Sequence, residues 1–305
     1  MKSDSVIISE VGPRDGLQNA STIMPLEGKV AWIEALVQSG FVDIEVGSFV
    51  SPTLLPQLAD TGLLLEQLRK KTCAAKLAVL VPNLKGATLA LAKQPDKISI
   101  PFSCSQTHSI KNVNRTHEQM FSEIVAIKNL LDSLPDPKPS FEVGLSTAFG
   151  CTIEGDISQS AVLDIATKLI SLGIHDMSVA DTTGYANPNQ VREMMKSLRY
   201  YIGAHAASSI HLHNTRGLGL ANALAAYEVG VTVFDSSCGG LGGCPFAPGA
   251  SGNIVTEDLV FMFESMGVAT GIDITKLLSL RAILKKYLPM EPLYGFLADA
   301  GLPKK

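Results

Sequence analysis

Two histidines separated by one residue are the first feature of the sequence that suggests chemistry. His211 and His213 lie in Ser-Ile-His-Leu-His-Asn, a segment typical of a β-strand. Because side chains alternate across a strand, both imidazoles are expected on one face, roughly 6 to 7 Å apart at their bases. Two such imidazoles can bind one cation, although the alternative for an isolated pair is ordinary hydrogen bonding inside the fold.

Oxygen ligands for the same cation are expected from two other segments. Asp15 follows the first expected strand, and closure of a barrel brings the first, seventh and eighth strands side by side. Asp15, the two histidines and Asn253 can therefore share one part of the barrel rim. This ligand set, which contains no thiolate, favours Mg²⁺ or Mn²⁺ and leaves Co²⁺ or Fe²⁺ as alternatives. Asn253 also has a second interpretation, as the N-cap of a helix over Ile254–Phe263.

Three further charged residues are candidates for catalysis. Arg14 lies in Val-Gly-Pro-Arg-Asp-Gly-Leu-Gln, where glycine and proline predict a tight turn at a strand end. A guanidinium fixed beside a metal is suited to stabilising an enolate or thioester oxygen. Glu45 and Asp181 are candidates for a general base or for groups that orient a ligand. Each carboxylate alone could instead belong to a buried ion pair.

The last candidate is a thiol in a glycine-rich segment. Cys244 lies in Gly-Gly-Leu-Gly-Gly-Cys-Pro, which predicts a flexible loop able to close over a substrate. A phosphate-binding loop is the alternative, but the segment lacks the Lys-Ser/Thr pair that such a loop requires. The five cysteines are widely spaced and odd in number, so we expect reduced thiols.

The chain as a whole predicts the elements that position these residues. Short apolar runs, each followed by a helix-like stretch, recur eight times, and runs that are apolar on both faces indicate covered parallel strands. We therefore predict a single (β/α)8 barrel over residues 1–272 and a helical extension over residues 273–305 that packs on the barrel. The expected strands are Val6–Val11, Val42–Val46, Leu77–Val81, Ile98–Phe102, Phe141–Leu145, Met177–Ala180, Ile210–His213 and Val231–Asp235.

Composition favours a small-molecule substrate. The chain has 305 residues, 46% of them apolar, and a formal net charge of −4, with no dense Lys/Arg run. It therefore has no electrostatic signature of binding to nucleic acid or to an anionic membrane surface. No leader-like segment and no window near the roughly 20 apolar residues of a membrane span is present, so we expect a soluble, cytoplasmic protein.

The motifs together resemble the 3-hydroxy-3-methylglutaryl-CoA lyase family across nearly the whole chain. That resemblance implies metal-dependent retro-Claisen cleavage of an acyl-CoA to acetyl-CoA and a keto acid. The first and last of the motifs are the most specific. The motifs are Val-Gly-Pro-Arg-Asp-Gly-Leu-Gln-Asn ending at Asn19, Glu45 before Ser-Phe-Val-Ser-Pro, Pro-Asn-Leu-Lys-Gly around Asn83, Asp181-Thr, His211-x-His213, and Gly-Leu-Gly-Gly-Cys-Pro with Gly-Ala-Ser-Gly-Asn ending at Asn253.

The resemblance also assigns roles to individual residues. Asp15, His211, His213 and Asn253 would bind Mg²⁺ or Mn²⁺. Arg14 would stabilise the enolate, Glu45 and Asp181 would assist proton transfer, and Cys244 would be the catalytic thiol. The residues expected to contact substrate are Arg14, Gln18, Asn83 and Thr147. The expected partner is a small acyl-CoA, and the expected assembly is a homo-oligomer, most simply a dimer.

Several residues depart from the pattern of lyases specific for hydroxymethylglutaryl-CoA, and they leave alternatives open. They are Asn214, Arg216, Thr147, Thr152 and the segment Ser103–His108. A citramalyl-CoA lyase, producing acetyl-CoA and pyruvate, is the first alternative. A Claisen-type synthase of the isopropylmalate or homocitrate kind is the second, and a noncatalytic binding barrel is the third.

Overall fold

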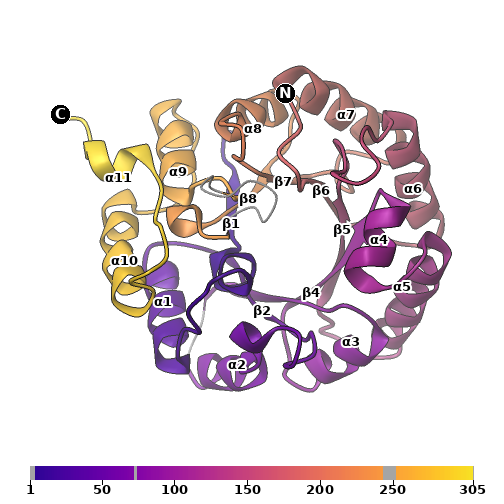
Figure 1. The fold of residues 1–305 in the computed structure, drawn as a ribbon, viewed down its shortest axis with the longest axis horizontal. Helices are drawn as coiled ribbons and strands as arrows, with labels where there is room; N and C mark the ends of the chain where they lie inside the picture. The colour runs from indigo at the N-terminus through magenta and orange to yellow at the C-terminus, as the bar shows by residue number, and fades with distance from the viewer. Residues whose placement is uncertain (1–3, 72–73, 243–251, 305) are drawn as a thin grey trace.

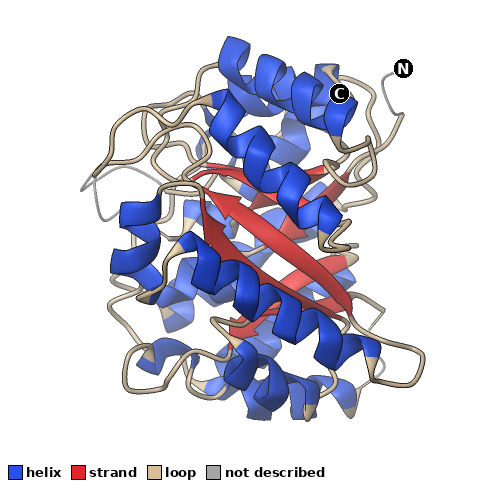
Figure 2. Cartoon of the chain, turned by 90° about the vertical axis from the view of Figure 1, so that its right-hand side faces the viewer, coloured by secondary structure: helices blue, strands red, loops and turns tan. Residues whose placement is uncertain are grey.

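The computed structural model describes residues 4–71, 74–242 and 252–304, and in this part of the chain eight parallel strands form a closed barrel. The strands pair in chain order, and β8 closes the ring on β1. Figure 1 shows the ring with helices outside it, and Figure 2 shows it from the side. The predicted (β/α)8 barrel is confirmed, and every expected strand overlaps an observed one. The strands are β1 (Ile7–Glu10), β2 (Asp43–Ser48), β3 (Lys76–Leu80), β4 (Lys97–Ser103), β5 (Ser140–Ser146), β6 (Met177–Asp181), β7 (Ser209–Leu212) and β8 (Val233–Ser236).

Helices cover the outside of the barrel and connect successive strands. Polar caps fix where several of them begin: the Asn187 side chain accepts hydrogen bonds from the backbone of Asn189 and Gln190 at the start of α7, with Pro188 in the first helical position. The helices of the described chain are α1 (Leu26–Gln38), α2 (Thr61–Arg69), α3 (Leu84–Leu91), α4 (Gln106–Val113), α5 (His117–Asp132), α6 (Gln159–Ser171), α7 (Pro188–Tyr201), α8 (Gly219–Glu228), α9 (Thr256–Ser265), α10 (Ile274–Tyr287) and α11 (Phe296–Ala300).

The two faces of the strands have different compositions. In β4, Phe102 is fully buried and packs against Phe121 of α5, with ring centroids 4.8 Å apart. Lys97 and Ser99 of the same strand line a cavity inside the barrel. The expectation of strands that are apolar on both faces is therefore wrong for the interior. Small and polar side chains there leave space that bulky apolar residues fill in many barrels.

The C-terminal helices pack beside the N-terminal part of the barrel. Helix α10 contacts α1 and α9, and α11 contacts α9 (Figure 1). Arg281 of α10 donates to the Glu257 carboxylate at 2.9 Å and to the Tyr294 carbonyl at 2.8 Å. These contacts support the division of the chain at residue 273 into barrel and extension, which stays a prediction.

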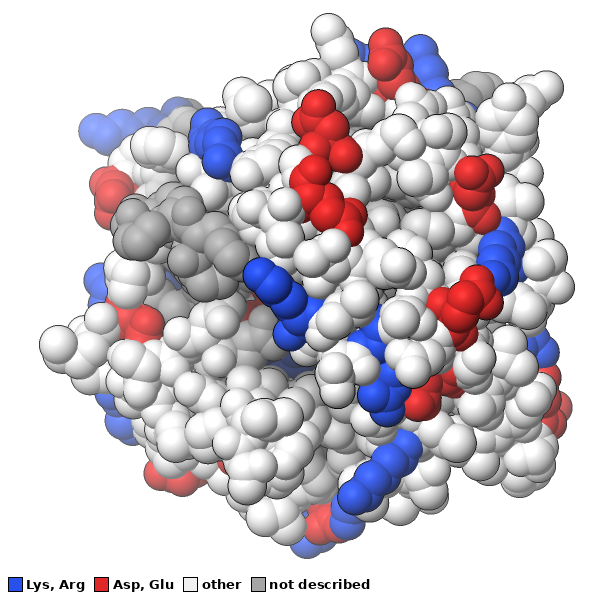
Figure 3. Space-filling view, turned by 45° about the vertical axis from the view of Figure 1, so that its right-hand side comes forward, with Lys and Arg blue, Asp and Glu red and all other residues white. Residues whose placement is uncertain are grey.

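The surface carries charges of both signs. Figure 3 shows acidic and basic side chains distributed over one face of the molecule, in keeping with the small net charge of −4. Among the helices that the structure describes, none has the length and hydropathy needed to cross a membrane.

Candidate active site

The turn after β1 brings Arg14 and Asp15 to the carboxyl end of the barrel. Residues Gly12–Gly16 form a short π-helix, in which the Asp15 amide donates to the Val11 carbonyl at 2.7 Å. A Cβ atom at Gly12 would lie 2.4 Å from Oε1 of Glu10 and 2.9 Å from the Trp32 ring. Glycine is thus required at this position by close packing, and the turn is held in one place.

Arg14 lies between two carboxylates. Its Nε atom donates to Oε2 of Glu45 at 2.5 Å, and its Nη1 atom donates to Oδ1 of Asp15 at 2.6 Å. Gln18 also donates to Oδ1 of Asp15, at 2.8 Å. Burial raises the pKa of Glu45, although the charge of Arg14 opposes the shift. The guanidinium is therefore fixed in orientation rather than free in solvent.

The two histidines converge as the sequence predicted. The Nε2 atoms of His211 and His213 lie 3.1 Å apart, and Nε2 of His211 lies 4.0 Å from Oδ2 of Asp15. On its other side, Nδ1 of His211 lies 3.2 Å from Oδ2 of Asp235. One imidazole nitrogen from each ring is therefore directed toward the same small volume beside Asp15.

Asn253 completes this group from the other side. It forms an isolated antiparallel bridge with His213, and its Nδ2 atom donates to Oδ2 of Asp15 at 2.7 Å and to the Leu241 carbonyl at 3.0 Å. The interpretation of Asn253 as a helix cap is wrong, because α9 begins at Thr256 and its N-cap is Val255. The loop before α9 is held by the bridge to β7 and leaves the Asn253 side chain for the site.

The group has the donors that a divalent cation requires. Ligand atoms of Asp15, His211 and His213 lie within 4.8 Å of one another. Oδ1 of Asn253 is buried and has no hydrogen-bond partner among the described residues, a costly arrangement for an amide oxygen unless another group binds it. Two imidazole nitrogens, a carboxylate and an amide oxygen therefore fit Mg²⁺, Mn²⁺ or a similar ion.

The ionisation of the group also suits a cation. Burial opposes ionisation of Asp15, but the charges of Arg14 and the two histidines lower its pKa to about 2. Burial, together with the charge of His211, lowers the pKa of His213 to about 4. Near neutral pH, Asp15 is therefore an anion and His213 retains a lone pair, which are the forms that bind metals.

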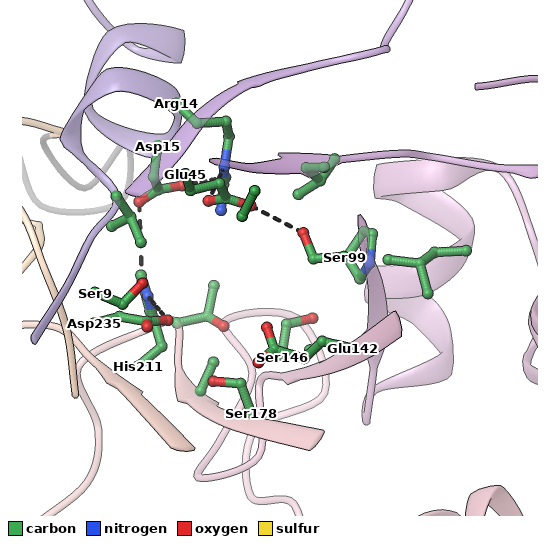
Figure 4. A pocket seen from close by; sticks show the side chains of 18 of the residues that line it. Ser9, Arg14, Asp15, Glu45, Ser99, Glu142, Ser146, Ser178, His211 and Asp235 are labelled. Atoms are coloured by element: carbon green, nitrogen blue, oxygen red, sulfur yellow. Dashed lines mark hydrogen bonds and ion pairs between the residues drawn. The ribbon is translucent and has the colours of Figure 1, made fainter. Parts of the chain in front are cut away.

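A cavity of about 360 Å³ extends from this group into the barrel. Figure 4 shows labelled carboxylates, serines and His211 around it. Its deeper wall is charged: Nζ of Lys97 lies 2.9 Å from Oε2 of Glu142, and Asp43 and Asp235 line the same space. His108 and Asn112 of α4 line it as well. The metal-type donors and Arg14 thus border a polar space large enough for a small ligand.

Three residues proposed from the sequence do not line this cavity. Asp181 accepts hydrogen bonds from the backbone of Tyr185 at 2.9 Å and Ala186 at 3.2 Å, and burial raises its pKa to about 6. Asn83 caps α3 by accepting from the Gly86 amide at 3.0 Å. Thr147 is fully buried, and its Oγ1 atom donates to the Ser146 carbonyl at 2.7 Å. These contacts are structural.

Cys244, the proposed catalytic thiol, lies outside the described residues, as does Cys73. Of the remaining cysteines, Cys104, Cys151 and Cys238 are buried and form no disulfide. Their state agrees with the reduced thiols expected from the sequence.

The sequence interpretation missed several residues of the cavity. Asp235 ends the expected eighth strand, so the criterion that selected Glu45, an acid at the carboxyl end of a strand, could have found it. Glu142 lies inside an expected strand, and Lys97 just precedes one; no local signal places either side chain in the interior. His108 lies in one of the departing segments.

Comparison with known proteins places this geometry among related sequences. A family model described as HMGL-like matches residues 5–284. The chain is 39% identical over 274 residues to hydroxymethylglutaryl-CoA lyase YngG of Bacillus subtilis, covering 90% of each protein. It is 40% identical over 273 residues to the mitochondrial hydroxymethylglutaryl-CoA lyase of Rattus norvegicus, covering 90% of this chain and 82% of the relative.

Solved structures agree with the sequence matches. An HMG-CoA lyase from Acinetobacter baumannii in complex with coenzyme A and 3-methylmalate aligns with a TM-score of 0.90 and 42% identity, over 98% of this chain and 95% of that one. The Bacillus subtilis HMG-CoA lyase aligns with a TM-score of 0.91 and 36% identity, over 98% of both chains. The carboxyl transferase domain of Rhizobium etli pyruvate carboxylase, at 16% identity and a TM-score of 0.70, shares the fold.

Proposed function

The chain belongs to the HMGL-like family, and from that premise we propose that it is a carbon–carbon lyase that cleaves 3-hydroxy-3-methylglutaryl-CoA to acetyl-CoA and acetoacetate. The observation that carries the proposal is the convergence of Asp15, His211, His213 and Asn253 beside Arg14 at the cavity. A noncatalytic barrel would not need an unpartnered amide oxygen and two facing imidazoles at this position.

We propose that these four residues hold Mg²⁺ or Mn²⁺. When bound, the ion would supply a Lewis acid for the substrate's hydroxyl and carbonyl oxygens. The unpartnered Oδ1 atom of Asn253 and the facing Nε2 atoms of the histidines support this ligand set.

The cleavage requires a proton acceptor and a group that stabilises negative charge. The tertiary hydroxyl loses its proton and becomes a carbonyl, the adjacent carbon–carbon bond breaks, and its electron pair forms the enolate of acetyl-CoA, which then takes up a proton. Arg14, held by Glu45 and Asp15, offers its positive charge to the enolate oxygen. Glu45 lines the cavity and has a raised pKa, so it is our preferred base over Asp181, whose oxygens accept backbone hydrogen bonds.

The proton donor to the enolate is a separate proposal. The resemblance assigns it to Cys244, which lies outside the described residues. Assembly as a homodimer likewise stays a prediction.

The size of the cavity supports a short acyl group. At about 360 Å³, it lies at the lower end of the ~300–1,000 Å³ of small-molecule sites. The acyl part of the substrate fits inside, whereas most of coenzyme A must lie outside the barrel. The solved relative that holds coenzyme A and 3-methylmalate, a short branched hydroxydicarboxylate, supports a substrate of this class.

Most of the departing residues are remote from the cavity. Asn214 accepts from the Gly219 amide at 3.0 Å, and Arg216 donates to the carbonyls of Thr183 and Gly184. Only His108 of these residues lines the cavity. We therefore keep hydroxymethylglutaryl-CoA as the first substrate and test citramalyl-CoA beside it.

The test is acetyl-CoA release from protein loaded with Mg²⁺ or Mn²⁺ and offered hydroxymethylglutaryl-CoA and citramalyl-CoA in parallel. We expect cleavage that EDTA abolishes and added metal restores. His213→Ala should remove cleavage, whereas Asn83→Ala should keep it. Cleavage of citramalyl-CoA alone would move the substrate to the alternative, and cleavage of neither would contradict the lyase proposal.

A further inference from the structure

The two histidines of the site are held differently on the side away from Asp15. Nδ1 of His211 lies 3.2 Å from Oδ2 of Asp235. Nδ1 of His213 is buried and has no hydrogen-bond partner among the described residues. A side chain therefore fixes the orientation of only one of these two rings.

The barrel itself sets the distance between His211 and Asp235. The two residues are directly paired in the parallel register of β7 and β8, and both line the cavity. In Figure 4 they lie together on the wall below Asp15. Because neighbouring strands are joined by backbone hydrogen bonds, this contact needs no flexible loop to form.

Asp235 belongs to a charged layer deeper in the barrel. Lys97 and Glu142 form an ion pair at 2.9 Å, with side chains only 12% and 11% exposed. Asp43 also lines this space and accepts from Oγ of Ser9 at 3.1 Å, so it bonds a serine rather than a histidine. Asp43 and Asp235 are thus two carboxylates of the same layer, of which only Asp235 contacts the metal-type group.

We propose that Asp235 is a positioning residue that accepts a hydrogen bond from Nδ1–H of His211 and thereby keeps the Nε2 lone pair directed toward Asp15, His213 and Asn253. A neutral imidazole carries one proton, so fixing it on Nδ1 leaves Nε2 free as a ligand. Carboxylates that hold metal-binding histidines in this way orient the ring and strengthen it as a ligand. The inference rests on the metal site of the proposed function.

Binding of Mn²⁺, followed by electron paramagnetic resonance on purified full-length protein without substrate, tests the proposal. Asp235→Ala is expected to weaken Mn²⁺ binding by about 10–100-fold. Asp43→Ala removes the same charge from the same layer and should bind Mn²⁺ like wild type. Asp235→Asn keeps the size of the side chain and serves if the alanine variant does not fold; it should also bind more weakly, because its amide can turn a donor toward Nδ1.

Two further measurements separate positioning from a general effect of charge. In a His211→Ala background, Asp235→Ala should cause no additional loss of Mn²⁺ affinity, because its effect passes through His211. In metal-free protein, ¹⁵N NMR of His211 should show the Nδ1–H tautomer in wild type and a mixture in Asp235→Ala.

The outcomes are distinguishable. Equal weakening by Asp43→Ala and Asp235→Ala, or no weakening by either, would overturn the positioning role of Asp235. If wild type bound no Mn²⁺, the metal site itself would fail, and the tautomer of His211 would still decide whether Asp235 orients the ring.

Discussion

The Asn253 side chain donates from Nδ2 to Oδ2 of Asp15 at 2.7 Å, joining residues 238 positions apart in the sequence. The same amide group also donates to the Leu241 carbonyl, so both of its protons are used within the protein. Its oxygen, buried and unpartnered among the described residues, is left for a ligand. The contact thus closes the candidate metal site between the first and last segments of the barrel.

Asn253→Ala should weaken Mn²⁺ binding on the order of 10-fold or more, because it removes both a ligand oxygen and the hydrogen bond that holds Asp15. Titration calorimetry with Mn²⁺ measures the change. Asn112→Ala is the matched control, since Asn112 is another amide at the cavity but is not part of the metal group. Unchanged Mn²⁺ affinity in Asn253→Ala would exclude this residue as a ligand.

Arg14→Lys should lower kcat by about 10²–10³-fold while changing KM much less. Lysine keeps the charge but lacks the planar group that reaches Glu45 and Asp15 at the same time. Steady-state release of acetyl-CoA measures both constants. Arg216→Lys, in an arginine that donates to backbone carbonyls of the β6–α7 connection, should have little effect. A kcat equal to that of wild type would remove Arg14 from enolate stabilisation.

Glu10→Gln should flatten the dependence of stability on pH between about 4.5 and 7. Burial raises the pKa of Glu10 from 4.5 to about 7, against hydrogen bonds from Thr256 and Cys238 that favour the charged form. In this window the folded state holds a proton that the unfolded state releases, so stability falls as pH rises. One proton corresponds to a slope of about 1.4 kcal/mol per pH unit.

Urea unfolding at several pH values checks the effect of Glu10→Gln. Glu118→Gln is the surface control, since the Glu118 side chain is 80% exposed. We expect the urea midpoint of wild type and of the control to fall with rising pH more steeply than that of Glu10→Gln. Parallel curves for all three proteins would show that Glu10 does not titrate in this range.

Asn83→Ala should lower the free energy of unfolding by about 1 kcal/mol and leave KM unchanged, because the Asn83 side chain caps α3. Asn83→Ser retains a capping oxygen and should recover most of the loss. Urea unfolding measures stability, and acetyl-CoA release measures KM. A raised KM with unaltered stability would instead support the substrate contact expected from the sequence.

The sequence by itself was sufficient for the fold and for much of the site. Eight apolar runs separated by helix-like stretches predict the barrel, because strand and helix periodicities are local properties of the chain. The position of Asp15 after the first strand and the spacing of His211 and His213 predict their convergence, because parallel strands of a closed barrel end on the same rim. Such arguments need only strand order and alternation.

The tertiary structure decided which way the remaining side chains point and what they contact. Ser178 and Ala180 of β6 line the cavity, so the alternation of the strand turns Asp181 away from it. The pairing of His211 with Asp235 depends on the register between β7 and β8, and the contact of Asn253 with Asp15 depends on a loop that returns to the rim. Register and loop closure are set by packing across the whole barrel, because a shift of one residue reverses which face a side chain occupies.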